Sequence, residues 1–208
     1  MRIDHIIIGV RDLEDAALRF ETSYGLRSLP GGRHPGGTAN RIVPLAPPEY
    51  IELLAVAEAG SEADLWLSPL LTEGDRIVGW ALQVADIESV GLRLGRAPSP
   101  GSITHDDGTT GHWRFVGGMS PNRPFFIAYD GDMAHRSARQ RANYERANHP
   151  SRPGGVEWIE VGGDESRLRR WIGMDQLPGM RFVGGEPGVR SIGVSAPTGE
   201  LVIDEQLA

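Results

Sequence analysis

The chain of 208 residues contains neither cysteine nor lysine, since all 21 of its basic residues are arginine. The absence of cysteine excludes disulfides, zinc–thiolate sites and thiol nucleophiles. The absence of lysine excludes a Schiff-base lysine and the lysine of a phosphate-binding P-loop. Long apolar runs are also missing: none approaches the length of a membrane span, and the N-terminus shows no signal-peptide pattern. We therefore expect a cytoplasmic protein with no membrane partner.

Extended stretches of positive charge are missing as well. The formal net charge is −7, and no block of basic residues is long enough to follow a phosphate backbone. Nucleic acid is therefore not an expected partner. The arginine-bearing segment 132–153 is polar, with periodic alanine, and this pattern indicates a linker or an exposed helix rather than a nucleic-acid contact.

Three stretches of the chain share one plan. Each begins with a strand-like apolar run, continues through an amphipathic helical pattern and returns as hairpin-linked strand-like runs. The pattern predicts an α+β fold of three βαβββ units, near 1–58, 76–131 and 154–206. We expect one domain at 1–131 made of the first two units, a linker or helix at 132–153, and the third unit at 154–208.

The three units also keep a common register. A short acidic side chain stands between the first strand and the helix of each unit, where it can cap free N–H groups: Asp12, Asp86 and Asp164. Aligned on these aspartates, the first strands place three residues at one position: His5, Gly79 and Glu157. An arginine follows at nearly equal spacing on the third strand: Arg41, Arg114 and Arg190. Such agreement indicates an internal repeat.

The repeat, the DH pair in the first strand and the glutamate inside YIELLAV (50–56) resemble the vicinal-oxygen-chelate superfamily. That superfamily contains glyoxalase I, methylmalonyl-CoA epimerase, extradiol dioxygenases and the bleomycin- and fosfomycin-resistance proteins. The stretches GGRHPGGTANRIVPL (31–45) and PFFIAYD (124–130) are similar to its glyoxalase-like domain group. The resemblance implies that the first two units pair into an open cup-shaped sheet that takes a small molecule. It also implies histidine or glutamate metal ligands on the first and last strands of both units.

His5 and Glu52 match the two ligand positions of the first unit. Their counterparts in the second unit, taken as Gly79 and Ala128, cannot bind a metal. Two protein ligands are too few for a tight site, so a divalent metal ion would need a further ligand. The candidates are His34, His105 and His112.

The same pair is competent without a metal. A carboxylate at Glu52 fixes the tautomer of the His5 imidazole and leaves the other ring nitrogen free to abstract a proton. The alternative is an inert pair, in which His5 is a satisfied strand histidine that supplies the partner a buried Glu52 requires.

The glycine-rich loop 33–40 is a candidate for contact with a substrate. It offers His34, Thr38 and Asn40 together, and its backbone N–H groups can approach an anionic or carbonyl oxygen closely. The alternative is a flexible connector, because turn residues often have this composition.

Arg114 is a candidate clamp for a carboxylate or phosphate. Strand alternation puts His112, a second candidate for substrate binding, on the same face and Trp113 on the other. Because Arg41 and Arg190 occupy matched positions, Arg114 can equally be a surface or packing residue. The chain alone leaves open which face of this strand points inward.

These features predict an enzyme acting on a small oxygenated metabolite by proton transfer next to a carbonyl, of the isomerase, lyase or epimerase type. His5 is the expected base and Glu52 its orienting partner. One alternative is a metal-dependent glyoxalase- or dioxygenase-type enzyme with His5 and Glu52 as ligands. Another is a binder that sequesters a drug-like molecule without catalysis. The third unit either covers one end of the sheet or pairs across a two-fold axis, and we expect a homodimer.

Overall fold

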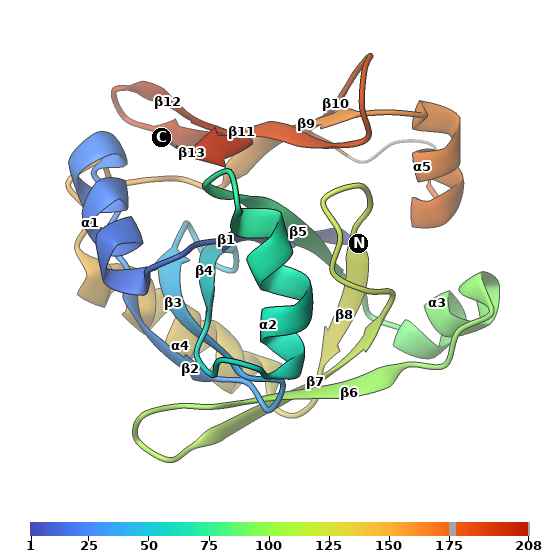
Figure 1. The fold of residues 1–208 in the computed structure, drawn as a ribbon, viewed down its shortest axis with the longest axis horizontal. Helices are drawn as coiled ribbons and strands as arrows, with labels where there is room; N and C mark the ends of the chain where they lie inside the picture. The colour runs from blue at the N-terminus through green and yellow to red at the C-terminus, as the bar shows by residue number, and fades with distance from the viewer. Residues whose placement is uncertain (175–177, 208) are drawn as a thin grey trace.

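The computed structural model describes residues 1–174 and 178–207 and contains two β-sheets (Figure 1). The first repeat comprises β1 (Arg2–Gly9), α1 (Leu13–Tyr24), β2 (Leu29–Arg33), β3 (Thr38–Pro44) and β4 (Tyr50–Val56). The second comprises β5 (Asp75–Gln83), α3 (Ile87–Leu94), β6 (Ser99–Thr104), β7 (Thr110–Val116) and β8 (Phe125–Tyr129). Both repeats have the predicted order of one strand, one helix and three strands.

The helices of the repeats begin and end as the sequence predicts. Asp12 accepts hydrogen bonds from the backbone N–H groups of the first turn of α1, and Asp86 does the same for α3. Gly25 and Gly95 end these helices in the left-handed conformation, at φ +64° in both cases, which favours glycine. The shared caps place α1 and α3 at equivalent positions, so the internal repeat extends to the ends of its elements.

The strands of the two repeats form a closed, barrel-like sheet. Within each repeat the first strand pairs in parallel with the last, and the order continues through the third strand to the second. β1 pairs antiparallel with β5 along most of its length, whereas β2 and β6 meet only through Arg33 and Thr104. The predicted α+β class is confirmed. The open cup is corrected to a barrel-like sheet, because the repeats join at both edges.

The third predicted unit has the expected element order but a different sheet. It comprises β9 (Val156–Gly162), α5 (Glu165–Ile172), β10 (Met180–Val183), β11 (Gly188–Ala196) and β12 (Gly199–Asp204). Here β9 pairs in parallel with β10, the second strand rather than the last, and antiparallel with β11. A short β13 (Gln206–Leu207) then joins the barrel beside β5. The third unit is therefore not a copy of the other two in its strand pairing.

The second sheet, formed by the third unit, packs against the outside of the barrel (Figure 1). Ile159 and Ile192 belong to the same buried apolar cluster as Ile6 of β1, together with Phe20 of α1. Within the chain, the third unit thus lies on the outer face of the barrel sheet.

A second apolar cluster lies inside the barrel. Ile7, Leu54 and Phe125 point away from the face that α1, α3 and the second sheet cover, and therefore into the barrel. They contact Leu67 and Leu71 from α2 (Glu62–Leu67) and the 3₁₀ helix η1 (Ser68–Leu71). Helix α2 lies in front of the sheet in Figure 1, and Leu67 and Leu71 of this connector pack within the interior cluster.

The repeated arginines hold helices onto the outer face of the sheet. Arg41 pairs with Glu14 of α1 at 2.7 Å, and Arg114 pairs with Glu88 of α3 at 2.6 Å. Arg190 departs from this pattern and pairs with Glu205 at 2.6 Å. The common spacing of the arginines is thus explained by the same helix–sheet contact in the first two repeats.

Helix α4 (Met133–Ala147) occupies most of the predicted linker. Its middle and C-terminal parts are tied down by Gln140, which donates to the carbonyl of Pro48 at 2.8 Å, and by Tyr144, which donates to the carbonyl of Pro153 at 2.7 Å. No helix within the described ranges is both long and apolar enough to cross a membrane.

Candidate functional site

A β-bulge in β1 brings the side chains of Asp4 and His5 into contact. Ile3 pairs with Leu82 and His5 with Ala81, so Asp4 is an extra residue between adjacent pairs. Neighbouring side chains of a regular strand point to opposite faces, but a bulge re-aims one of them. The Asp4 carboxylate therefore reaches the His5 ring, with 2.7 Å between Oδ2 and Nδ1. Both residues are buried.

The second nitrogen of His5 faces Glu52 of β4. The distance from His5 Nε2 to Glu52 Oε2 is 3.6 Å, and Glu52 is only 7% exposed. The His5 ring stacks on Tyr50 with 4.6 Å between centroids and meets the ring of Phe125 edge-on at 5.7 Å. These contacts fix the imidazole plane and leave Nε2 directed at the carboxylate.

Asp4 is held as a carboxylate by its surroundings. The Tyr129 hydroxyl donates to Oδ2 at 2.6 Å, and a nitrogen of Arg136 lies 3.7 Å from Oδ1. Burial alone would raise the pKa of Asp4, but the hydrogen bond and charge of His5, the charge of Arg136 and the Tyr129 hydroxyl hold it below its ordinary value. Burial, then the neighbours Tyr50 and Asp4, raises the pKa of Tyr129, so this phenol keeps its proton.

The first oxygen of Glu52 is bound by residues of the glycine-rich stretch. Asn40 donates to Oε1 at 2.6 Å and itself accepts from the N–H of Gly32 at 2.9 Å. His34 Nε2 lies 3.9 Å from the same Oε1, and its Nδ1 bonds the Thr38 hydroxyl at 2.8 Å. The structure thus groups five of the predicted site residues: His5, His34, Thr38, Asn40 and Glu52.

The glycine-rich loop is shaped by a close approach of α2. Gly37 has φ +92°, and a Cβ built on it would lie 2.3 Å from the hydroxyl of Ser61, the N-cap of α2. The carbonyl of Gly36 accepts from the N–H of Ala63 at 3.0 Å. The glycines therefore anchor the connector, and the side chains of the loop carry the polar contacts.

Arg114 and His112 are not brought together with this site. Trp113 and Phe115 pack with the interior cluster, so their neighbours on β7 point outward. Arg114 pairs with Glu88 at 2.6 Å and with Asp130 at 3.4 Å, and His112 is exposed. Both side chains lie on the outer face of the barrel, so the structure does not place the predicted anion clamp and substrate contact beside His5 and Glu52.

The second repeat supplies no mirror image of the pair. Ala81 stands two residues after Gly79, as Ile7 does after His5, so Ala81 is the counterpart of Ile7. Ile7 pairs with Glu52 and Ala81 pairs with Phe125, so the counterpart of Glu52 is Phe125 and not Ala128. A Cβ built on Gly79 would lie 2.8 Å from Cγ of Met119, which occupies the space where a ligand would stand. The second repeat therefore supplies neither a histidine nor a carboxylate at the positions of His5 and Glu52.

The donor set does not fit the divalent metal ion that the resemblance implies. Throughout the described part of the chain, no three or more histidine or carboxylate side chains are arranged to hold a metal ion. His105 bonds the carbonyl of Gly31 through Nδ1 at 2.7 Å, and His112 is on the outer face. Neither histidine supplies the third ligand that the His5–Glu52 pair lacks.

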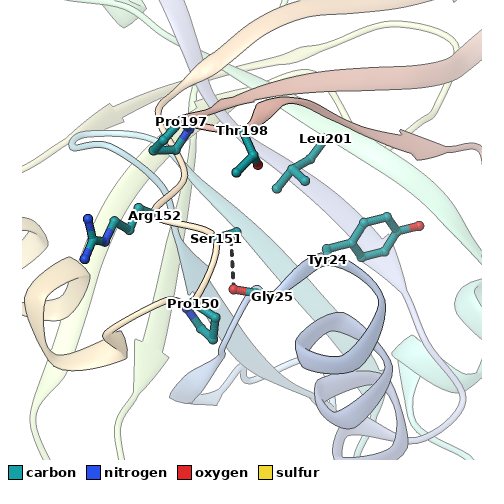
Figure 2. Close-up of a pocket in the computed structure, with 8 residues that line it drawn as sticks. All are labelled: Tyr24, Gly25, Pro150, Ser151, Arg152, Pro197, Thr198 and Leu201. Atoms are coloured by element: carbon teal, nitrogen blue, oxygen red, sulfur yellow. Dashed lines mark hydrogen bonds between the residues drawn. The ribbon is translucent and has the colours of Figure 1, made fainter.

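A surface pocket lies away from these residues. It has a volume of about 470 Å³ and is formed where the end of α1, the segment 150–152 and the β11–β12 turn meet. Figure 2 shows Tyr24, Leu201 and Arg152 among its lining, with the Ser151 hydroxyl bonded to the carbonyl of Gly25. None of the predicted site residues lines this pocket.

Comparison with known proteins identifies the family. Residues 3–173 match the model of the family described as "Glyoxalase-like domain". The chain belongs to this family. The match covers both repeats, α4 and the start of the third unit, and includes all the residues of the candidate site. It confirms the resemblance seen in the sequence. No curated protein matches the chain.

Solved structures resemble the chain at low identity. A hypothetical protein from Staphylococcus aureus is 17% identical, with a TM-score of 0.65 over 97% of this chain and 84% of that one. A Streptomyces coelicolor methylmalonyl-CoA epimerase variant is 17% identical, with a TM-score of 0.45 over 63% and 99%. The Mycobacterium tuberculosis methylmalonyl-CoA epimerase is 17% identical, with a TM-score of 0.42 over 64% and 90%. The first of these likenesses shows the shared fold.

Three residues of the site escape prediction from the sequence. Asp4 precedes His5 in an apolar run, where regular alternation would direct it to the other face. Tyr129 ends an aromatic strand whose residues are expected to form the core. Arg136 lies in a polar segment without a site motif. The one signal in the sequence is an ionisable residue within the apolar start of β1, since a buried carboxylate requires partners.

Proposed function

We propose that this protein catalyses proton transfer next to a carbonyl group in a small oxygenated metabolite, as an isomerase, lyase or epimerase. The observation that carries the proposal is the buried Asp4–His5 pair, whose free nitrogen Nε2 faces Glu52 at 3.6 Å. Membership of the glyoxalase-like domain family supports a small-molecule site in the barrel. The proposal assigns the orienting role to Asp4, and Glu52 becomes a second proton-transfer group.

His5 is the proposed base. When Asp4 accepts the Nδ1–H, the neutral ring presents the lone pair of Nε2 to the barrel interior. The ring takes a proton from carbon, and the adjacent Asp4 carboxylate stabilises the resulting imidazolium. The base and its orienting group are thus within hydrogen-bond distance, as acid–base catalysis requires.

Glu52 is the second group placed to give or take a proton. Its Oε1 is held by Asn40 at 2.6 Å, which leaves Oε2 on the side of His5. His34, with Nδ1 fixed by Thr38, points Nε2 toward the same carboxylate and is placed to donate to an oxygen of the substrate. Removal of the proton by His5 leaves the electron pair on the carbonyl oxygen as an enolate, and a second proton-transfer group beside the same carbon can return a proton to it, as a two-base epimerisation requires.

Deuterium exchange tests this function with a panel of candidate substrates. Small hydroxyketones and 2-oxo acids are incubated with the protein in D₂O, and loss of the carbon-bound proton is followed by NMR. We expect faster exchange than in buffer for at least one compound, and a loss of roughly 100-fold or more in His5→Gln. His112→Gln, an exposed histidine on the outer face, is the matched control and should exchange at the wild-type rate. Equal rates for wild type and His5→Gln across the panel would contradict the proposal.

Ligand binding without chemistry is the second candidate. It is favoured by the aromatic side chains inside the barrel, where the rings of Phe125 and Trp113 lie 5.7 Å and 6.0 Å from those of His5 and His34. Saturable quenching of tryptophan fluorescence by a ligand that undergoes no exchange in D₂O would select this function. Elemental analysis completes the comparison, because a stoichiometric ion lost in His5→Gln would select the metal-dependent alternative.

A further inference from the structure

Arg136 of α4 is the only cationic side chain within salt-bridge distance of Asp4 in the described residues, apart from His5. One guanidinium nitrogen lies 3.7 Å from Asp4 Oδ1, and the guanidinium carbon lies 3.2 Å from the centre of the Tyr129 ring. Asp4 Oδ1 and that nitrogen are both buried, and neither has a hydrogen-bond partner within the described ranges. The two atoms are thus matched in charge and face each other in a water-poor environment.

Helix α4 is attached unevenly, and Arg136 is its attachment at the N-terminal end. Gln140 and Tyr144 bond the chain beyond the helix, whereas residues 132–135 are exposed. The Asp132 side chain caps its own helix. Arg136 alone reaches from this end to the Asp4–Tyr129 pair among the polar contacts of the described chain. Arg136 therefore links the N-terminal end of α4 to the candidate site.

The charge of Arg136 bears on the state of the imidazole. A buried carboxylate without a compensating cation tends to take up a proton. A guanidinium stays charged under all ordinary conditions, so it favours the ionised form of a neighbouring carboxylate. An ionised Asp4 accepts the Nδ1–H of His5, and in the neutral ring the lone pair then lies on Nε2, the nitrogen that faces Glu52.

We propose that Arg136 is a positioning residue, which keeps Asp4 ionised and thereby keeps the proton of His5 on Nδ1 and the lone pair of Nε2 directed at Glu52. The catalytic consequence rests on the proposed function, whereas the effect on the imidazole does not. The residue acts through Asp4 and has no contact with the reacting atoms.

The tautomer of His5 tests the proposal directly. In ¹⁵N-labelled protein, imidazole nitrogens that carry a proton and those that carry a lone pair have distinct shifts, and His5→Gln identifies the signals of His5. The neutral ring is selected by raising the pH until the signals stop moving. We expect wild-type protein to hold the proton on Nδ1, and Arg136→Gln to shift the major population to Nε2–H.

Two further variants make the result specific. Arg139→Gln removes an exposed charge from the same helix and should leave the His5 pattern unchanged. Arg136→Lys retains a cation and should keep most of the wild-type tautomer. If Arg136→Gln does not fold, Arg136→Met replaces it, because it keeps an unbranched stem over Tyr129. A wild-type tautomer in a folded variant without the charge would overturn the proposal.

The two proposals fail separately. Proton exchange that depends on His5, together with an unchanged tautomer in Arg136→Gln, would overturn the role of Arg136 and leave the function standing. A shifted tautomer without any exchange by wild-type protein would establish the positioning effect and overturn the function.

Discussion

The contact between Asp4 and His5 depends on a single irregularity of the backbone, the bulge in β1. Without the extra residue in β1, alternation would direct the Asp4 side chain away from His5, and the imidazole would lose the acceptor for Nδ1. The same bulge buries a carboxylate completely, so the site and the stability of the fold share one charged group. Variants at this position therefore need a stability measurement beside any functional one.

Asp4→Asn should lower the free energy of unfolding at neutral pH by about 3 kcal/mol, because it leaves Arg136 buried without its counter-charge. The pKa of Asp4 is lowered in the folded state, so the stability contributed by the carboxylate is present above the ordinary value of 3.8 and is lost as the pH falls through the folded pKa. Urea unfolding at a series of pH values should therefore show the two proteins converging below about pH 4. Asp106→Asn, in an exposed turn, is the control.

Glu52→Gln should keep the fold, because the amide is nearly isosteric and can still bond Asn40. Proton exchange or ligand binding should fall about ten- to a hundred-fold, since the variant removes a charged group that faces His5, the proposed base. An inert core pair would give the opposite pattern, with a changed melting temperature and unaffected binding. Both quantities should be measured on the same preparation.

At the scale of elements, periodicity in the sequence predicts most of the fold. Apolar alternation and the aspartate caps predict the strands and helices of the repeats, because local propensity and burial agree there. The connector helix α2 is missed, since six residues give too short a pattern. The outward face of β7 is missed for another reason. Alternation fixes that Arg114 and Trp113 oppose each other, but only the packed barrel decides which of them is inside.

The strand pairing of the third unit could not be predicted from the same pattern. Its order of elements repeats that of the other two, but β9 accepts β10 as its parallel neighbour in place of the last strand. The unit packs on the outside of the barrel and does not close a second one. Its strands therefore have the same local sequence pattern as those of the other units but make a different tertiary contact.

His149, just after α4, makes hydrogen bonds that depend on pH. His149 Nδ1 accepts from the N–H of Arg27 at 2.9 Å, and Nε2 donates to the carbonyl of Pro44 at 2.7 Å, so the bonded ring is neutral. Burial, with the charge of Arg27, lowers the pKa of His149. Its contribution to stability is thus fully present above 6.5 and is lost as the pH falls through the folded pKa.

We therefore expect the free energy of unfolding to decrease as the pH falls below 6.5. His149→Gln should be less stable than wild type at neutral pH and should lose this part of the pH dependence. Chemical unfolding of both proteins at a series of pH values checks the expectation. Parallel curves for the two proteins would show that the acid sensitivity arises from another group.

At the scale of the whole molecule, the third unit and the barrel share one core. Ile159, Val161 and Ile192 belong to the same cluster as Ile3 and Ile6 of β1. Trp171 of α5 also donates to the carbonyl of Pro124, at 2.8 Å, just before β8. The predicted boundaries at residues 131 and 154 therefore describe how the chain is organised, and do not imply that either part is stable alone. The homodimer stays a prediction.

A fragment of residues 1–153 should not fold stably. Removing the third unit uncovers the outer apolar face of β1 and the side of β5 that β13 occupies. We expect a lost or strongly lowered cooperative thermal transition and increased binding of an apolar dye. The full chain measured under the same conditions is the reference. A fragment with the melting temperature of the full chain would show that the barrel is an autonomous domain.

The barrel is closed by two strand pairs of very different length, β1–β5 and β2–β6, and this difference decides where the barrel opens most easily. β1 and β5 form a long ladder, whereas β2 and β6 share the single pair of Arg33 and Thr104, aided by the bond from His105 to Gly31. The lowest-energy opening should therefore occur along β2 and β6. Amide hydrogen exchange should be fastest among the barrel strands there and slowest in β1. A small molecule that moves to the buried imidazole would then pass between β2 and β6, through a gap that exists only during such fluctuations.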